Sequence, residues 1–340
     1  MDSLTQIVLG ASVAALAVPP AQRRRALVAG AMLGTLPDLD IVPLALMGVD
    51  AVTYVTWHRG PSHSLPVLTL LGLLVWWLAK LGSGVVRAAP RRWLAAIWLA
   101  LLTHPLLDAF TVYGTQLWWP LTPPPTMWSS IFIIDPAYTL PLLAGCVAAW
   151  YWRERGVARR WLWAGVLLSS VYLGWSLIAK ARIDDIAART LTARGLADAP
   201  RFSVPTPFNT LLWRVVVLTP DGFLEGDYSL VADSGPIRFR QYPSEQAALT
   251  RVAETPAVAR LLWFTHGFVK AEAHQGTLVL ADLRMGAEPD YSFRYAVARQ
   301  DGQGLWQAVQ PEQLNWTFTS RRGLNALWHR IWHAAEEYAS

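Results

Sequence analysis

Ionisable side chains are scarce in the first half of this chain. Residues 1–179 contain only three histidines and seven acidic residues, although the 340-residue chain carries 24 Asp and Glu in all. Hydrophobic residues make up 53% of the chain and tryptophan occurs 19 times, which excludes an ordinary soluble domain. Because charged groups are costly at membrane depth, the few found in such sequence are usually kept for function or for mutual pairing.

Cysteine and the common catalytic signatures are also lacking. The single Cys146 excludes an internal disulfide. The chain has no G-x-S-x-G, no phosphate-binding glycine loop and no C-x-x-C, so nothing indicates a nucleophile elbow, a nucleotide site or a thiol redox pair. The basic cluster at residues 23–25 follows the first apolar stretch instead of preceding it, so we expect no cleavable signal peptide.

The second half of the chain has no excess of charge. Residues 180–340 carry 17 basic and 17 acidic side chains, so the whole net charge of +5 lies in the first half. There it falls in short loops, a pattern that reports membrane topology and not a ligand surface. We therefore expect membrane lipids as partners and no nucleic acid.

Six apolar segments account for most of the first half. Four of them approach the roughly 20 residues that cross a bilayer as a helix. The first is short and Pro37 interrupts the second, so these two could instead form a broken or re-entrant pair. The segments are residues 4–18, 26–47, 65–81, 93–110, 131–152 and 161–179.

Three basic loops set the expected orientation of these segments, because short positive loops stay in the cytoplasm. The N-terminus and the part after residue 179 then lie outside, in the periplasm of a bacterial inner membrane. Arg59 is the only basic residue in the two external loops, and every His or Asp cluster falls near the external side. The basic loops are residues 23–25, 80–92 and 153–160.

From residue 201 the sequence changes to short strands separated by turn signals. The predicted fold is therefore a mainly α polytopic membrane helical bundle over residues 1–180, a helical connector at 181–200, and a small periplasmic α+β domain over 201–340. Strands are predicted at 208–219, 227–230, 237–241, 269–273, 276–281 and 291–298, and helices at 244–264 and 321–338.

His104 and Asp108 form the first candidate pair for a metal site. They are four residues apart in a predicted helix, so they lie on one face about 5–6 Å apart at Cβ, which suits two ligands of one ion. The alternative is a histidine that is hydrogen-bonded to a carboxylate inside the bundle. The spacing alone does not separate the two interpretations.

Asp38 and Asp40 follow Pro37, which ends a helix, so both carboxylates could turn inward from irregular backbone. The alternative is an ordinary helix end capped by one of them. His58 and His63 are five residues apart around Gly60-Pro61, which predicts a loop that leads into the next helix. Taken singly, they could be two interfacial histidines.

Asp135 stands before Pro136 at the start of the fifth segment. It could cap that helix, orient a ligand histidine, or bind the ion itself. In the tail, His329 and His333 share a face of a surface helix, a common spacing with no chemical implication. Together the polar clusters predict one or two divalent ions, zinc first, held by a common set of side chains: His58, His63, His104, Asp38, Asp40 and Asp108.

These clusters, in this order, resemble the bacterial membrane-bound metal-dependent hydrolase family of inner-membrane proteins. The family pattern runs D-x-x-T-H, L-P-D-x-D, H-R-x-x-T-H-S, H-x-x-x-D and Y-G-T-x-x-x-x-P. Two tail stretches, at 205–214 and 282–286, also look like the longer members. Gln6 stands where the family usually has histidine and Ser62 where it has threonine. The matching residues are 1–5, 36–40, 58–64, 104–108 and 113–120.

The resemblance implies hydrolysis of an ester or phosphoester at the periplasmic membrane face. A bound metal would activate water, and Asp38 or Asp135 would serve as general base. A site at the membrane interface favours an amphiphilic, lipid-linked substrate. Two alternatives remain at this point: a transporter or ion-binding protein that uses the same residues, and a membrane protein in which the network is purely structural.

Overall fold

The computed structural model describes residues 1–152, 155–315 and 323–334, and the chain divides into two compact units. The first unit comprises Met1–Met47, Trp57–Trp128 and Phe132–Ser176. The second comprises Gly48–Thr56, Ser129–Ile131 and Leu177–Ser340. Each unit is described by itself below.

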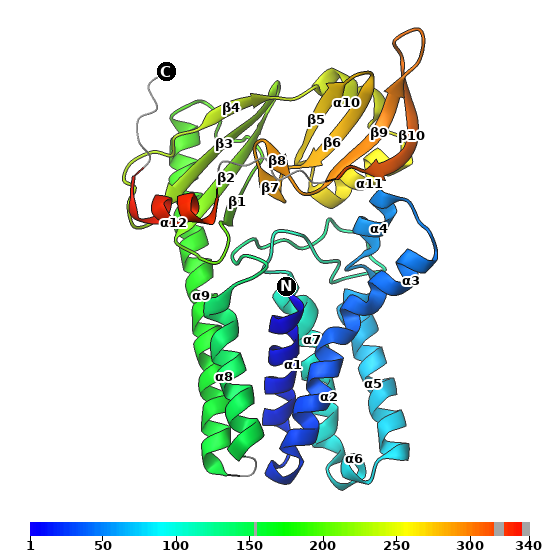
Figure 1. Ribbon diagram of the computed structural model, residues 1–340, viewed down its shortest axis with the longest axis vertical. Coiled ribbons are helices and arrows are strands. Elements are labelled where there is room, and N and C mark those ends of the chain that lie inside the picture. The colour runs from blue at the N-terminus through cyan, green and yellow to red at the C-terminus, as the bar shows by residue number, and fades with distance from the viewer. Residues whose placement is uncertain (153–154, 316–322, 335–340) are drawn as a thin grey trace. The chain divides into compact units, whose positions relative to one another are not determined.

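The first unit is a bundle of long helices that run side by side (Figure 1). Helix α1 lies at its centre and packs against α2, α7 and α8. The helices are α1 (Ser3–Ala17), α2 (Arg23–Thr35), α3 (Ile41–Leu46), α5 (Leu65–Gly82), α6 (Gly84–Ala88), α7 (Pro90–Asp108), α8 (Pro136–Trp152) and the first part of α9 (Gly156–Thr192), with 3₁₀ turns at Pro20–Gln22, Leu36–Asp40 and Pro61–His63.

Helices α1 and α2 touch through glycine. A Cβ placed at Gly34 would come 2.6 Å from the carbonyl oxygen of Gln6, and Gly10 and Gly30 meet backbone to backbone in the same way. Gly30 and Gly34 are four residues apart on α2, the spacing that lets two membrane helices approach closely. This contact brings the end of α2 against the centre of the bundle, where the candidate site lies.

Among the described residues, three helical stretches are long and apolar enough to cross a membrane: Pro20–Leu46, Leu65–Gly82 and Gly156–Thr192. They correspond to the second, third and sixth predicted segments, so the prediction of six membrane segments is not supported. The other three segments form helices that are short or polar. Helix α1 has 15 residues and α8 has 17, whereas α7 has 19 but carries Arg91, Arg92, His104 and Asp108.

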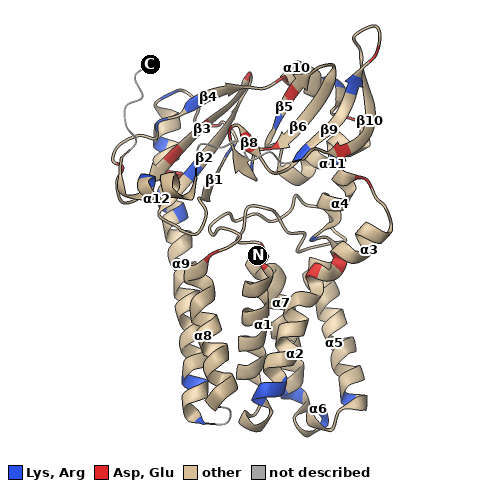
Figure 2. Ribbon diagram, in the orientation of Figure 1, with Lys and Arg blue, Asp and Glu red and all other residues tan. Residues whose placement is uncertain are grey.

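Charge is distributed unevenly along the bundle (Figure 2). Lys and Arg gather at the end where α6 lies, and acidic residues colour the opposite end, beyond α2. Helix α2 shows the same polarity in its own sequence, because it begins at Arg23 and is followed by the turn that holds Asp38 and Asp40. The basic and acidic clusters therefore lie at opposite ends of this unit.

The second unit contains two antiparallel four-stranded sheets, ordered β1-β2-β3-β4 and β10-β9-β6-β5. The second part of α9 packs its apolar face on the first sheet, around the fully buried Trp213. The elements are α4 (Ala51–Trp57), β1 (Arg201–Pro205), β2 (Leu212–Thr219), β3 (Gly222–Ser229), β4 (Arg240–Pro243), α10 (Gln246–Val252), α11 (Pro256–Thr265), β5 (Val269–His274), β6 (Thr277–Asp282), β7 (Gly286–Ala287), β8 (Asp290–Tyr291), β9 (Arg294–Gln300), β10 (Trp306–Gln313) and α12 (Leu324–Trp332).

The helix predicted at 244–264 is wrong as a single element. The structure has two helices there, α10 and α11, because Pro256 has no backbone N–H and occupies the first turn of a new helix. The strand predicted at 208–219 begins only at Leu212, since Asn209 closes a turn by accepting hydrogen bonds from two backbone N–H groups that follow it. Of the helix predicted at 321–338, residues 321–322 and 335–338 lie outside the described residues.

Candidate metal centre

Four side chains from three separate segments converge inside the first unit. Asp38 comes from the 3₁₀ turn after α2, His63 from the 3₁₀ turn before α5, and His104 and Asp108 from α7. Each offers one ligand atom, and these atoms all lie within 4.8 Å of one another. Pro37, Pro61 and Pro105 stand in these segments, and the first two lie inside the short turns that deliver Asp38 and His63.

The atoms at the centre are two imidazole nitrogens and two carboxylate oxygens. His63 Nε2 lies 3.0 Å from His104 Nε2. Asp38 Oδ1 is 3.3 Å from each of these nitrogens. Asp108 Oδ2 is 3.3 Å from His63 Nε2 and 3.5 Å from His104 Nε2. The side chains of His63, His104 and Asp108 are fully buried, and that of Asp38 is 20% exposed.

The Nδ1 atom of His104 is 2.5 Å from the carbonyl oxygen of Gly34. A carbonyl can only accept, so Nδ1 carries the proton of this contact. In a neutral ring, Nε2 then presents its lone pair to the centre of the cluster. The close packing of α1 on α2 is what brings Gly34 to this position.

His63 is oriented in a similar way, through a serine. Its Nδ1 lies 2.9 Å from Ser62 Oγ, which donates in turn to Asp40 Oδ2 at 2.5 Å. Because the serine proton goes to Asp40, Oγ accepts from the Nδ1–H of His63. The neutral His63 ring therefore also turns a lone pair inward, and the chain Asp40–Ser62–His63 fixes its tautomer as outer partners of metal ligands do.

The two oxygens of Asp108 have different surroundings. Oδ1 accepts from the Gln6 side-chain amide at 3.1 Å and also contacts the amino group of Met1. Oδ2 faces the cluster, lies 3.2 Å from Arg59 Nε, and is buried without a hydrogen-bond donor. Gln6 also donates to the His104 carbonyl at 3.2 Å, so it holds the two α7 residues in register.

This arrangement fits a divalent cation. Four electron-pair donors face one another at 3.0–3.5 Å over five measured pairs. Donors around an ion in a tetrahedron, with bonds of about 2.0–2.1 Å, are separated by roughly 3.3 Å. The buried Asp108 Oδ2 makes no hydrogen bond and has Arg59 Nε at 3.2 Å as its cation, so an ion at the centre would give this oxygen a second positive partner. The residues present therefore suit a metal ion with nitrogen and oxygen ligands.

A sequence model of the YdjM inner membrane protein family matches residues 1–183, just over half of the chain. The chain belongs to this family. The matched region includes all four residues of the cluster. Family membership therefore places the protein in the inner membrane, in agreement with the three candidate spans, while the hydrolase activity expected from the resemblance is not shown by it.

The chain is also similar to the uncharacterized protein YfhP of Bacillus subtilis (strain 168), with 27% identity over 165 residues. The alignment covers 44% of this chain and 46% of YfhP, so the chain spans about half the length of that relative. No solved structure matches the chain.

Three of the side chains predicted for the site lie outside the four-residue group. His58 and Asp40 pair with each other instead, since His58 Nδ1 is 2.8 Å from Asp40 Oδ1. Asp135 caps α8 by accepting from the Ala137 backbone N–H at 3.0 Å, and its other oxygen accepts from the Tyr172 hydroxyl at 2.8 Å. Within this YdjM-family bundle, Asp135 is thus a capping residue that does not join the cluster.

Sequence reasoning missed Arg59 as part of the site. Its φ of +62° lies in the left-handed region, and the side chain is buried over the Tyr113 ring while its guanidinium reaches Asp108. One signal was available, because Arg59 is the only basic residue in the two loops expected to be external. The sequence shows Ser62 only as a departure from threonine. Its role in orienting His63 depends on a contact with Asp40, which is distant in the sequence.

Proposed function

We propose that the protein is a membrane-bound, metal-dependent hydrolase. The observation that carries the proposal is the convergence of four acceptor atoms, three of them on fully buried side chains. Two are imidazole nitrogens whose Nδ1 partners turn the lone pairs inward. Asp38, His63, His104 and Asp108 would hold the ion, and imidazole with carboxylate favours zinc among common ions. The proposal covers one or two ions, and the four ligand atoms of the group support one.

A bound divalent ion would supply Lewis-acid chemistry, by polarising an ester or phosphoester and making water acidic enough to attack near neutral pH. The exposure of the side chains indicates the side from which a substrate would reach the cluster. Asp38 is the one exposed member of the four, and the His58–Asp40 pair beside it is also only partly buried. A substrate would therefore approach on the Asp38 side, where a further coordination position can open.

His58 is placed to take up a proton near that opening. Asp40 Oδ1 fixes the proton on Nδ1, so Nε2 of the neutral ring is the free basic atom. Its ring centroid is 5.8 Å from that of His63, close to the cluster but outside it. We assign the general-base role to His58 in place of Asp135, while Asp38 belongs to the ligand set.

The proposal includes the side of the membrane. The basic residues at the α6 end of the bundle favour a cytoplasmic location for that end. We therefore propose that the cluster and the part of the chain after the α9 span lie on the periplasmic side. A site at the interface suits a lipid-linked ester or phosphoester, which can reach it without leaving the bilayer.

The test begins with elemental analysis of the detergent-purified protein beside His104→Ala, followed by hydrolysis of chromogenic ester and phosphodiester probes. We expect bound zinc in the wild type, none in His104→Ala, and hydrolysis that follows the metal. His58→Gln should keep the metal and lose most of the hydrolysis. Equal metal content in wild type and His104→Ala would refute the proposal, and metal binding without hydrolysis of any probe would leave an ion-binding protein.

A further inference from the structure

The exposed apolar side chains of the second unit are concentrated in one place. Eight of its described residues are large, apolar and exposed. Only Leu305 lies apart from the others, in the β9–β10 connection. The other seven define what we term the apolar end of this unit: Leu177, Ile178, Phe208, Val231, Leu324, Trp328 and Trp332.

The contacts within the unit place these residues at the same end of the first sheet. Helix α9 enters the unit at Leu177, and Lys180 Nζ donates to Ser203 Oγ of β1 at 2.8 Å. Phe208 stands in the connection from β1 to β2. Val231 follows β3, where the backbone N–H of Leu230 donates to the Leu211 carbonyl at 2.9 Å.

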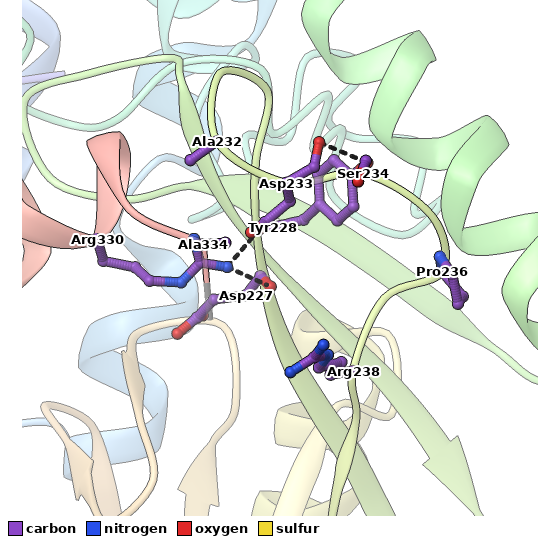
Figure 3. Close-up of a pocket in the computed structure, with 9 residues that line it drawn as sticks. All are labelled: Asp227, Tyr228, Ala232, Asp233, Ser234, Pro236, Arg238, Arg330 and Ala334. Carbon is purple, nitrogen blue, oxygen red and sulfur yellow. Dashed lines mark hydrogen bonds and ion pairs between the residues drawn. The ribbon is translucent and has the colours of Figure 1, made fainter. Parts of the chain in front are cut away.

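Helix α12 belongs to the same end and is firmly attached there. Ser229 Oγ, at the end of β3, donates to the Ile331 carbonyl at 2.6 Å, and the Ile331 side chain is buried. Arg330 reaches from α12 to Asp233 in the loop after β3 and forms an ion pair with it (Figure 3). The orientation of the helix on the sheet is therefore fixed.

With α12 held in this way, one stripe of its outer face is apolar, beside the exposed His329 and His333. Leu324, Trp328 and Trp332 follow one another at intervals of four residues, so they form one stripe, and they are 60%, 63% and 48% exposed. The remaining described tryptophans of this unit, Trp213, Trp263 and Trp306, are buried or half-buried. Trp328 and Trp332, the two exposed tryptophans among the described residues of this unit, therefore lie side by side on one helix.

Phe208 is presented with comparable rigidity. Its φ of +66° lies in the left-handed region, which is unfavourable for a residue with a side chain. Asn209 holds the turn, because its Oδ1 accepts from the Leu211 and Leu212 backbone N–H groups at 2.9 and 2.8 Å. The turn therefore holds the ring of Phe208 44% exposed. In water, a polar side chain at this position would avoid the cost of exposing an apolar ring.

We propose that the apolar end of the second unit rests in the interfacial layer of the bilayer, with Phe208, Trp328 and Trp332 among the lipid headgroups. Tryptophan favours this layer because its ring is apolar and its N–H needs a polar partner. The covalent path leads there as well, since α9 is one continuous helix that includes a candidate span and enters the unit at this end. The occupant of the apolar end is therefore lipid.

Site-directed spin labelling of the full chain tests this contact. Cys146 is the only cysteine, so Cys146→Ala gives a background into which Trp328→Cys can be introduced and labelled. The protein is reconstituted into phosphatidylethanolamine–phosphatidylglycerol vesicles. We expect the label at 328 to be relaxed by oxygen, which concentrates in lipid, several-fold more than by a water-soluble nickel chelate.

The matched control is Gln303→Cys in the same background, an exposed position in the β9–β10 connection. Its label should show the opposite preference, for the nickel chelate. Trp332→Cys repeats the measurement in case the first variant does not fold. Equal nickel accessibility at 328, 332 and 303 would overturn the proposal. Exclusion of both reagents, with spin–spin broadening that disappears on dilution into excess lipid, would also overturn it and assign the surface to a second copy of the chain.

Discussion

The two units arrange buried charge differently. In the second unit, two buried carboxylates each pair with one arginine: Asp282 accepts from Arg284 through both oxygens, at 2.9 and 2.7 Å, and Glu225 accepts from Arg214 at 2.6 Å. In the first unit, two carboxylates and two imidazoles share one centre. Asp38, His63, His104 and Asp108 meet there, and the nearby cations, Arg59 and the Met1 amino group, both pair with Asp108.

The buried pairs of the second unit are complete in themselves. Arg214 also donates to the Leu283 carbonyl at 2.8 Å and so ties one sheet to the other. Burial lowers the pKa of Arg214, but Glu225 together with Tyr291 and Asp227 outweighs this and raises the pKa, so the cation keeps its charge. Such pairs stabilise a structure without further partners. In the cluster of the bundle, Arg59 and the Met1 amino group pair with Asp108 only, and a metal ion at the centre is part of the proposed function.

The largest effect should come from removing a member of the cluster. His104→Ala or Asp108→Ala should lower metal affinity by more than about 100-fold, because loss of outer partners alone costs about 10–100-fold. Helix α7 should persist, since neither side chain supplies its backbone hydrogen bonds. Metal titration with circular dichroism measures both quantities, and unchanged affinity with either substitution would remove that residue from the site.

Breaking a pair in the second unit should have the converse result. Arg284→Met leaves Asp282 buried and unpaired, which should cost about 3–5 kcal/mol of stability, while metal content stays unchanged. The double variant Arg284→Met with Asp282→Leu should recover much of the loss. Denaturation followed by fluorescence, beside elemental analysis, checks this. A parallel loss of metal would mean that the two units are energetically coupled.

Removing the serine that orients His63 should have a smaller effect. Ser62→Ala removes the acceptor for Nδ1–H, so we expect affinity to fall about 10–100-fold. Ser62→Thr restores the hydroxyl and should bind as the wild type does. If alanine and threonine behave alike in a competition titration, the path from Asp40 to His63 does not tune the site.

Gln6 should matter less, because it touches the cluster only through Asp108 Oδ1 and the His104 carbonyl. Gln6→His keeps an N–H that can donate to Asp108, so affinity should stay within about threefold, since outer partners are worth at most 10–100-fold. Gln6→Leu, which cannot donate, should bind more weakly. Marked tightening by histidine would instead place residue 6 among the ligands.

Asp135 should give the smallest effect. Asp135→Asn still offers an oxygen to the Ala137 backbone N–H, so we expect unchanged metal binding and a stability change below about 1 kcal/mol. Thermal unfolding and elemental analysis measure the two. Loss of the metal would instead show that Asp135 contributes to the site, although it lies outside the cluster in the structure.

Local spacing was enough to predict the local geometry of several side chains. The four-residue interval of His104 and Asp108 put them on one helix face, and Pro37 marked the break that turns Asp38 toward the cluster. Pro256 also indicates the break between α10 and α11, but we predicted a single helix across this position.

Contacts between distant segments could not be read in the same way. The sequence grouped His58 and Asp40 with the ligands because residue type and neighbourhood do not tell which partner a side chain faces. Arg59 depends on a left-handed backbone that an arginine rarely adopts, and Gly34 acts through its carbonyl, which no side-chain pattern reveals. The segment count differed because α1 and α8 are short and because the polar residues of α7 reduce its apolarity.

The glycine contact between α1 and α2 has a consequence for how the protein is made. Gly34 both permits the close approach of the two helices and holds the His104 ring, so any added Cβ at this position would disturb both at once. A nascent chain whose first hairpin has not closed would lack an oriented His104. Under the proposed function, the ion would bind only after this hairpin has closed, so metal occupancy would report its assembly.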